Sequence, residues 1–355
     1  MFKKDPILII LILIIGILFI YNPNLVKETP TFIRYHTLII LFTFMLITKG
    51  IEFSGYLNLF ADSFIEKAHT ERALAFSLVI IELAISPIIT NDISLFLIIP
   101  ITLAIARRIK FDIEKLIIFE IWAANIGSSL FPIGNPQNIY IYQISKMAFI
   151  EFIWKMIPFE IINISLLFTI IYFSFGKERV KIQNLVPIAK NKKLFLVSLS
   201  LLILSILLID YKHPLLAMII TLSLYIIFDV KIIYYGTNIN LLLIFTLLFI
   251  VIGGVKEIEV INRLFLSIRD VFFPSIILSQ VISNVPAALI LSAYTTSYTH
   301  LLYGINVAGN GTIISSLANL IGVRLGNISV KRFHLYSFFF LGITTILIYA
   351  YLKVF

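Results

Sequence analysis

The chain has 355 residues, of which 60% are apolar and only 13% are charged, and its mean hydropathy is +1.02. Soluble globular proteins are about 45–50% apolar and about 25% charged, so this composition excludes a soluble enzyme, a coiled coil, a disordered chain and most nucleic-acid binders. The net charge of +9 fits the excess of basic residues on the inner loops of membrane proteins. Because cysteine is absent, disulfides and thiolate chemistry are excluded as well. The composition therefore predicts an all-α polytopic membrane protein.

Apolar stretches long enough to cross a bilayer follow one another along the chain. A spanning helix needs about 20 mainly apolar residues. The first stretch follows Lys3 and Lys4 but has no small-residue cleavage site after it, which favours a retained helix over a signal peptide. The nine stretches that qualify as full spans are 6–22, 32–50, 116–143, 153–175, 194–210, 214–230, 239–254, 304–323 and 334–352.

Two further apolar regions, 73–105 and 271–298, are interrupted by polar residues at their centres. Each half is predicted to be too short to cross the membrane. Non-helical backbone at membrane depth is tolerated only inside protein or beside water, so each region is predicted to be a re-entrant hairpin. The residues at the predicted tips are Thr90, Asn91 and Asp92 in the first hairpin, and Ser283, Asn284, Val285 and Pro286 in the second.

The distribution of basic residues predicts the orientation. With the amino terminus inside, 19 of the 28 Lys and Arg residues lie in inner segments and nine in outer segments. This bias predicts a cytoplasmic amino terminus and an outer carboxyl terminus, in the cell membrane.

An internal repeat divides the chain. Residues 125–139 align with 306–320 at a constant offset of 181, with Asn125 over Asn306 and Asn138 over Asn319. The predicted parts are a first repeat over 1–175 with its broken helix at 116–143, a basic cytoplasmic connector and linker helix over 176–213, and a second repeat over 214–355 with its broken helix at 304–323. The spans give the repeats opposite orientations. Inverted repeats with interrupted helices are typical of secondary transporters, whose site lies at the repeat interface near the midplane.

The broken helices and hairpin tips supply the candidate binding groups. Freed carbonyl oxygens bind small cations, while the amino ends of half-helices carry partial positive charge that favours anions. We expect Asn91, Asn138, Asn284 and Asn319 to come close together near the midplane. The candidate substrate- and ion-binding residues are Thr90, Asn91, Asp92, Asn125, Gly127, Ser128, Ser129, Pro132, Gly134, Asn135, Pro136, Asn138, Ser283, Asn284, Pro286, Gly309, Asn310, Thr312, Ser315, Ser316 and Asn319.

Asp92 is the sharpest single candidate, because an ionised carboxylate at membrane depth is costly. It is predicted to bind a proton or to coordinate sodium with Asn91 and Asn138, and no other metal is expected. The alternative is a water-exposed tip at which Asp92 only caps a half-helix. Three further acidic residues are secondary candidates, for which the simpler expectation is a carboxylate near the membrane interface or one hydrogen bonded between helices: Glu82, Glu120 and Glu160.

The run from Ala124 to Asn138 closely resembles the A-N-x-G-x-x-x-x-P-I-G-x-P-x-N signature of the ion transporter superfamily. That group includes arsenite permeases, citrate–metal symporters, sodium/dicarboxylate symporters and some sodium/proton antiporters. The resemblance implies alternating access by an elevator or a related mechanism. The second unit departs from the pattern, because residues 313–317 lack its prolines, and this predicts a less sharp second break. Asp92 and Val285 stand where the dicarboxylate members have threonine, which argues against dicarboxylates.

The expected function is secondary active transport of a small anion (arsenite-like, an inorganic oxyanion or a carboxylate) coupled to sodium or protons. A sodium/proton antiporter and a channel remain alternatives. An intramembrane enzyme is disfavoured, since neither His-Glu-x-x-His nor Gly-x-Gly-Asp occurs. No phosphate-binding Gly-x-x-x-x-Gly-Lys-Ser/Thr motif is present, although a separate ATPase subunit stays open. The expected partners are the anion and the bilayer, with a homodimer left open, no nucleic acid, and no cofactor beyond the coupling ion.

Overall fold

A computed structural model describes residues 6–56, 68–106, 112–178, 191–256, 258 and 270–354, and most of them are helical. The helices of the first half are α1 (Pro6–Tyr21), α2 (Leu25–Phe32), α3 (Tyr35–Phe53), α5 (Glu71–Ile89), α6 (Asn91–Ala106), α7 (Ile113–Gly127), α8 (Pro136–Ser145) and α9 (Phe149–Ser174). Those of the second half are α10 (Lys192–Asp210), α11 (Pro214–Phe228), α12 (Lys231–Gly236), α13 (Ile239–Lys256), α15 (Phe272–Ile282), α16 (Asn284–Ser292), α17 (Tyr298–Ala308), α18 (Leu317–Leu325) and α19 (Val330–Val354).

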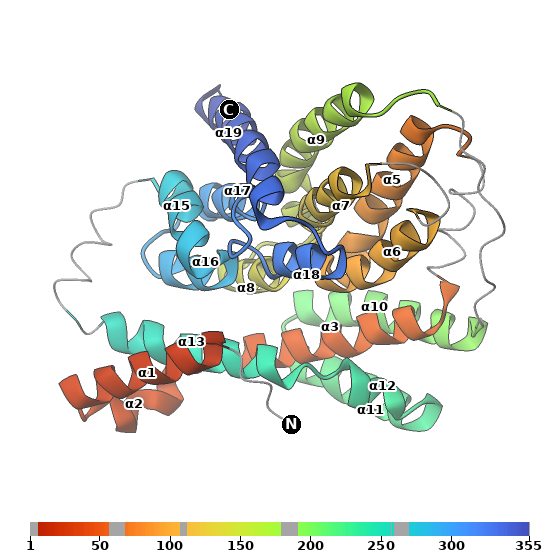
Figure 1. Ribbon diagram of the computed structural model, residues 1–355. Helices are drawn as coiled ribbons and strands as arrows, with labels where there is room; N and C mark the ends of the chain where they lie inside the picture. Colours follow the sequence, from red (N-terminus) through yellow and green to blue (C-terminus); the bar gives the residue numbers. More distant parts are fainter. Residues whose placement is uncertain are drawn as a thin grey trace.

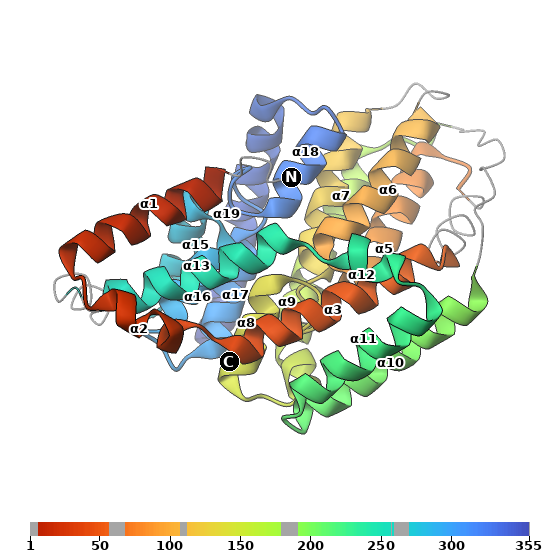
Figure 2. The same cartoon turned by 90° about the horizontal axis from the view of Figure 1, so that it is seen from below.

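The helices form two parts, which Figures 1 and 2 show from two directions. One part, the layer, contains α1–α3 and α10–α13; here α3 packs on α10, α11 and α12, and α1 packs on α13. The other part, the body, contains α5–α9 and α15–α19 and lies on one face of the layer. The two parts meet where α3 contacts α5 and α8 and where α13 contacts α16. Each part therefore takes helices from both halves of the chain.

Five helices in the described ranges are long and apolar enough to cross a membrane: α3, α5, α9, α10 and α19. Four of them match predicted full spans. The prediction that each hairpin arm is too short is wrong for α5, which has 19 residues. The other predicted spans are shorter helices or pairs of helices, so nine single spanning helices are not found there. Proline accounts for one end of two of these shorter helices, since Pro23 lies just after the last residue of α1 and Pro214 is the first residue of α11.

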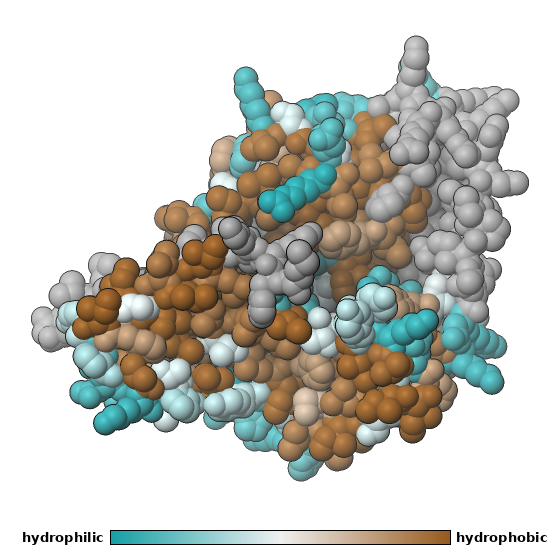
Figure 3. Space-filling view, turned by 60° about the horizontal axis from the view of Figure 1, so that its bottom comes forward, coloured by the Kyte–Doolittle hydropathy of each residue, from teal (hydrophilic) through white to brown (hydrophobic). Residues whose placement is uncertain are grey.

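The outer face of the layer is apolar. Ile12, Leu13 and Ile17 of α1 and Ile226 and Ile227 of α11 are all more than half exposed. Figure 3 shows hydrophobic residues over most of this face, with hydrophilic residues gathered in smaller patches. A continuous apolar surface of this kind is unfavourable in water and suits the hydrocarbon of a bilayer.

Both predicted hairpins are present as helix–turn–helix pairs, α5–α6 turning at Thr90 and α15–α16 turning at Ser283. The first broken helix consists of α7 and α8, separated by residues 128–135, and the second of α17 and α18, separated by residues 309–316. The prediction of a less sharp second break is wrong, because both gaps have eight residues. In the second loop, which lacks the signature's prolines, Ser315 Oγ and Asn319 Nδ2 each donate to the Thr312 carbonyl at 2.8 Å.

The short helices α2 and α12 were not predicted. Parts of the predicted loops fall outside the described residues, including 179–190 of the basic connector and 259–269 before the second hairpin.

Candidate functional site

The two hairpin tips share an unusual backbone conformation. Thr90 has φ 75° and ψ 150°, and Ser283 has φ 76° and ψ 156°. Residues other than glycine rarely adopt this region, at a cost of about 1–3 kcal/mol each, and such strain often marks a functional site. The next residue of each tip then binds a break: Asn91 N–H donates to Gly134 O at 3.2 Å, and Asn284 N–H donates to Ser315 O at 2.9 Å. The two acceptors are themselves 181 residues apart.

A network of buried amides joins the two breaks. Asn125 Nδ2 donates to Asn319 Oδ1 at 2.8 Å, and Asn306 Nδ2 donates to Asn138 Oδ1 at 2.9 Å. The two bonds are equivalent in the two repeats, because Asn125 aligns with Asn306 and Asn138 aligns with Asn319 at the offset of 181. Asn125 Oδ1 also accepts from Asn91 Nδ2 at 3.1 Å, so the first hairpin tip is part of the network. Of the four asparagines expected to come together, Asn91, Asn138 and Asn319 take part in this network through Asn125 and Asn306, and Asn284 reaches the second break through its backbone N–H.

Several predicted residues stabilise the loops of the breaks. Asn138 Nδ2 donates to Ser129 O at 3.0 Å, and Asn319 Nδ2 donates to Gly309 O at 2.8 Å. Asn310 is fully buried, and neither of its amide atoms has a partner among the described residues. Other predicted residues lie in or beside the breaks but do not line the central cavity. They are Asn125, Gly127, Ser128, Pro132, Gly134, Asn135, Thr312 and Ser315.

A cavity of about 80 Å³ lies between the tips and the breaks. Its walls contain the first residues of four helices, α6, α8, α16 and α18, and two apolar residues of α13 close it from the layer. The lining residues are Asn91, Asp92, Pro136, Gln137, Leu241, Ile244, Ser283, Asn284, Val285, Pro286, Ser316 and Leu317.

The four helix starts give this cavity its electrostatic character. The amino end of a helix carries about half a positive charge and unpaired N–H groups, and this combination binds anions. The described lining includes no Lys or Arg. It does include Asp92, in the first turn of α6, and Asn91, whose Oδ1 is buried without a partner among the described residues. The cavity therefore offers partial positive charge to an anion, and two oxygen-bearing side chains to a cation.

A wider cavity of about 480 Å³ adjoins the central one and shares Asp92, Pro136, Leu241 and Leu317 with it. This vestibule extends along α3 to Lys49 and Glu52, which pair with each other at 2.9 Å. The central cavity is thus approached from the carboxyl end of α3.

The three buried glutamates lie away from the central cavity and are hydrogen bonded. Glu82 accepts from Ser94, Glu120 accepts from Thr102 Oγ1 at 2.5 Å, and Glu160 accepts from Ser129. Each bond joins two different segments of the body.

Some site residues were not predicted. Gln137 follows Pro136 in the signature run, and Asn306 aligns with Asn125, so both carried a signal. Gln280 interrupts the apolar arm α15, and its Oε1 accepts from Thr312 N at 2.7 Å. Leu241 and Ile244 carried no signal, because nothing distinguishes them in sequence from lipid-facing residues.

Gly134→Ala is expected to destabilise the first break. An added Cβ would lie 2.0 Å from the Ser128 carbonyl oxygen, and because this neighbour is backbone it cannot move aside cheaply. We expect a loss of about 3 kcal/mol, at the upper end of overpacking costs. Thermal unfolding of the purified protein in detergent measures it. Gly342→Ala in α19 is the matched control, since no atom lies within 4 Å of its added Cβ. Equal unfolding temperatures for the two variants would contradict the tight packing of this loop.

Comparison with known proteins gives consistent matches. A family profile described as "Citrate transporter" matches residues 2–300. The chain is 35% identical to an uncharacterized transporter of Methanocaldococcus jannaschii, over 99% of both chains. It is 33% identical to the inner membrane protein YbiR of Escherichia coli, over 92% of this chain and 90% of that one. A shorter match of 36% identity joins 21% of this chain to 15% of a silicon efflux transporter of Oryza sativa subsp. japonica.

Proposed function

Because the chain belongs to the citrate transporter family, we propose that it is a secondary active transporter that carries a small anion in exchange for, or together with, sodium or protons. It is a multi-pass membrane transporter and not an enzyme, as its sequence predicted. The observation that carries the proposal is the central cavity, where the starts of α6, α8, α16 and α18 converge. Four helix dipoles aimed at one space stabilise negative charge without a basic side chain.

The size and polarity of the cavity define the substrate class. About 80 Å³ holds a few water molecules or one small anion, such as an inorganic oxyanion or a short carboxylate. The matched relative from rice is named for silicon efflux, so an inorganic substrate is included in the test. Uptake by proteoliposomes of arsenite, phosphate, sulfate and carboxylates, each with a sodium gradient or a pH step, tests this proposal.

The coupling ion is assigned to the first hairpin tip. Asp92 lines both the central cavity and the vestibule, so its carboxylate lies between the proposed substrate site and the space that leads to it. The buried Oδ1 of Asn91 beside it lacks a partner among the described residues and can serve as a further oxygen ligand. The second tip has Val285 at the position of Asp92. The two half-sites are therefore not equivalent, and the second mainly shapes the substrate pocket.

Access alternates by movement of the body against the layer. The vestibule lies at the carboxyl end of α3, between layer and body, and the central cavity opens to it. The two parts are joined by contacts of α3 with α5 and α8 and of α13 with α16, and by hydrogen bonds from Tyr142 and Phe149 of the body to Asp210 of the layer, which such a movement has to break. An elevator movement along α3 would carry the hairpins, the breaks and the bound anion as one unit toward the other side.

The two units are inverted in the cell membrane, with the amino terminus inside. The matched tips and the reciprocal amide bonds at an offset of 181 support this topology. Single cysteines introduced at positions 185 and 298 are expected to react with an impermeant maleimide from opposite sides of the membrane. Reaction of both positions from the same side would contradict the inverted arrangement. The chain has no native cysteine, so each label reports one site.

A sodium/proton antiporter is the second candidate. It is favoured by one observation, the carboxylate of Asp92 in the wall of the central cavity, because a negative side chain repels an anion unless a cation or proton neutralises it. Exchange of sodium for protons without any added anion in the same proteoliposomes would support this candidate.

A further inference from the structure

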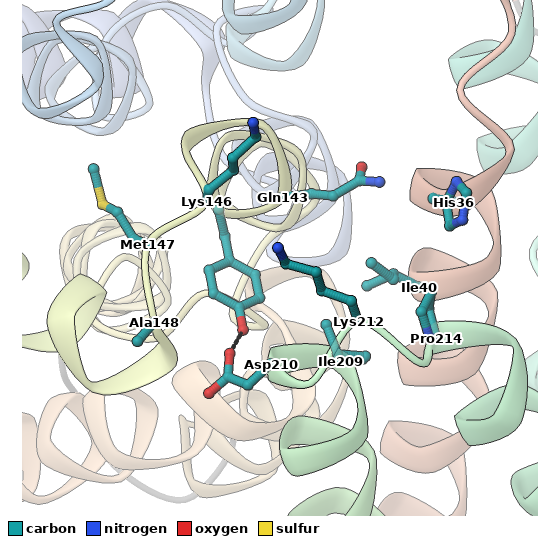
Figure 4. Close-up of a pocket in the computed structure, with 11 residues that line it drawn as sticks. His36, Ile40, Gln143, Lys146, Met147, Ala148, Ile209, Asp210, Lys212 and Pro214 are labelled. Atoms are coloured by element: carbon teal, nitrogen blue, oxygen red, sulfur yellow. Dashed lines mark hydrogen bonds between the residues drawn. The ribbon is translucent and has the colours of Figure 1, made fainter.

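A second pocket lies at the opposite end of α3 from the vestibule. Its volume is about 440 Å³, and it is lined by residues of α3, α10 and α11 of the layer, of α8 of the body and of the loop between α8 and α9. Figure 4 shows the side chains of Lys146, Gln143 and Lys212 around one space, with His36 across from Lys146. The pocket shares no lining residue with the central cavity or the vestibule.

The pocket carries a net positive charge, because two lysines and one aspartate line it. Lys146 and Lys212 are exposed, and neither makes a hydrogen bond or ion pair with any residue that the structure describes. Asp210 is the acidic residue in the described lining, and its carboxylate is already engaged: it accepts from the Tyr142 hydroxyl (dashed in Figure 4) and from Phe149 N–H at 3.3 Å. Two ammonium groups without an ion-pair partner among the described residues thus border one cavity.

Both lysines have left-handed backbone conformations, which favour glycine. Lys146 follows α8 with φ 57° and ψ 21°, and Lys212 lies beyond α10 with φ 65°. The bond from His213 N–H to Leu208 O, 2.7 Å long, closes the end of α10 behind Lys212. Glycine is the usual residue at such left-handed helix ends. A cation near a helix carboxyl end is favourable in itself, so an experiment has to separate that structural role from ligand binding.

We propose that Lys146 and Lys212 form a second anion-binding site, which collects a small oxyanion or carboxylate from solution at the end of α3 opposite the vestibule. The proposal rests on the proposed transport of an anion. The space is much larger than the central cavity, so the anion is held here with part of its hydration shell, between the two ammonium groups and within reach of the Gln143 amide. A positive concavity of this kind raises the local concentration of anions at this end of the contact between layer and body.

Protection from acylation tests binding directly. The full chain in detergent is treated with an impermeant amine-acylating reagent, with phosphate, sulfate or citrate present, or with chloride at matched ionic strength, and each lysine is followed by peptide mass spectrometry. We expect at least one polyvalent anion to slow the acylation of Lys146 and Lys212 together by several-fold. Lys155, which pairs with Glu151 at 3.5 Å, is the internal control and keeps its rate. If each of Lys146 and Lys212 is acylated at the same rate in all four salts, the proposal is overturned. It is also overturned if vesicles of anionic lipid protect the two lysines and none of the dissolved anions does.

Lys146→Gly/Lys212→Gly separates binding from folding, because glycine suits both backbone positions. The unfolding temperature is expected to stay the same or to rise. The anion concentration for half-maximal uptake at low ionic strength is expected to rise by about tenfold, within the range of electrostatic enrichment, with the maximal rate retained. Lys155→Gln is the control variant. A double variant that loses stability and keeps wild-type half-saturation would show that both lysines are only helix caps.

The outcomes also separate this site from the proposed function. Uptake without lysine protection leaves anion transport standing and removes the second site. Lysine protection without gradient-driven uptake of any anion keeps the site and removes the transport mechanism.

Discussion

Asp92→Asn is expected to make anion uptake independent of the cation gradient. Asparagine keeps the shape and a carbonyl oxygen of the side chain and removes the charge that binds a proton or sodium. The folded protein should survive, because a neutral side chain is cheaper to bury at membrane depth. Initial uptake rates in proteoliposomes, with and without an inward sodium gradient or pH step, are expected to become equal in the variant. Exchange of internal for external anion is expected to persist.

Glu151→Gln is the matched control for Asp92→Asn. Glu151 is a half-exposed carboxylate at the start of α9, paired with Lys155 and away from the central cavity. Its neutralisation should leave gradient dependence unchanged. If Asp92→Asn behaves like this control, Asp92 only caps α6, and coupling has to be assigned to Glu82, Glu120 or Glu160.

Asn125→Leu is expected to abolish uptake and to destabilise the body. Asn125 uses its whole amide: Nδ2 donates to Gly309 O at 3.1 Å and to Asn319 Oδ1, while Oδ1 accepts from Asn91 Nδ2 and Ser316 Oγ. Leucine has nearly the same size and none of these bonds. Each buried polar group left unpaired costs about 1–3 kcal/mol, and the first tip loses its connection to the second break. Thermal unfolding and initial uptake rate measure the two effects.

Asn163→Leu provides a matched buried control. Asn163 in α9 is also fully buried, but its Nδ2 donates only to Phe159 O of its own helix, and its Oδ1 has no partner among the described residues. Replacing it removes an unpaired oxygen, so stability should hold or improve. Similar losses for Asn125→Leu and Asn163→Leu would mean that the cross-unit network has no special role.

The tips and breaks were predictable because their chemistry is local. Asn, Asp, Gly and Pro inside apolar stretches are strong signals, and the turns at Thr90 and Ser283 and the interruption after Gly127 lie where those residues predicted them. The second interruption was predicted too weakly. Its loop lacks the signature's prolines but is held by side-chain hydrogen bonds from Ser315 and Asn319, and such bonds depend on contacts that a sequence pattern does not display.

The partners of the polar residues could not be predicted. Asn138 and Asn319 have the amides expected of ligands, yet they bond to loop carbonyls and to Asn306 and Asn125. The closure of the cavity by Leu241 was equally hidden, because it depends on how α13 lies against α16. The length of α5 was also misjudged, because the helix begins two residues before the predicted arm and reaches 19 residues, enough to cross a membrane.

Concentrative uptake is the most direct test of the central claim, that the cavity between the four helix starts carries an anion against its gradient. Proteoliposomes with wild-type protein are given equal internal and external concentrations of the anion that gave the strongest uptake, and a sodium or pH gradient is then imposed. The account predicts net accumulation inside, reversed when the gradient is reversed and absent with Asp92→Asn. Fluxes of the wild-type protein that equalise the anion and stay indifferent to both gradients would contradict secondary active transport and indicate a passive path.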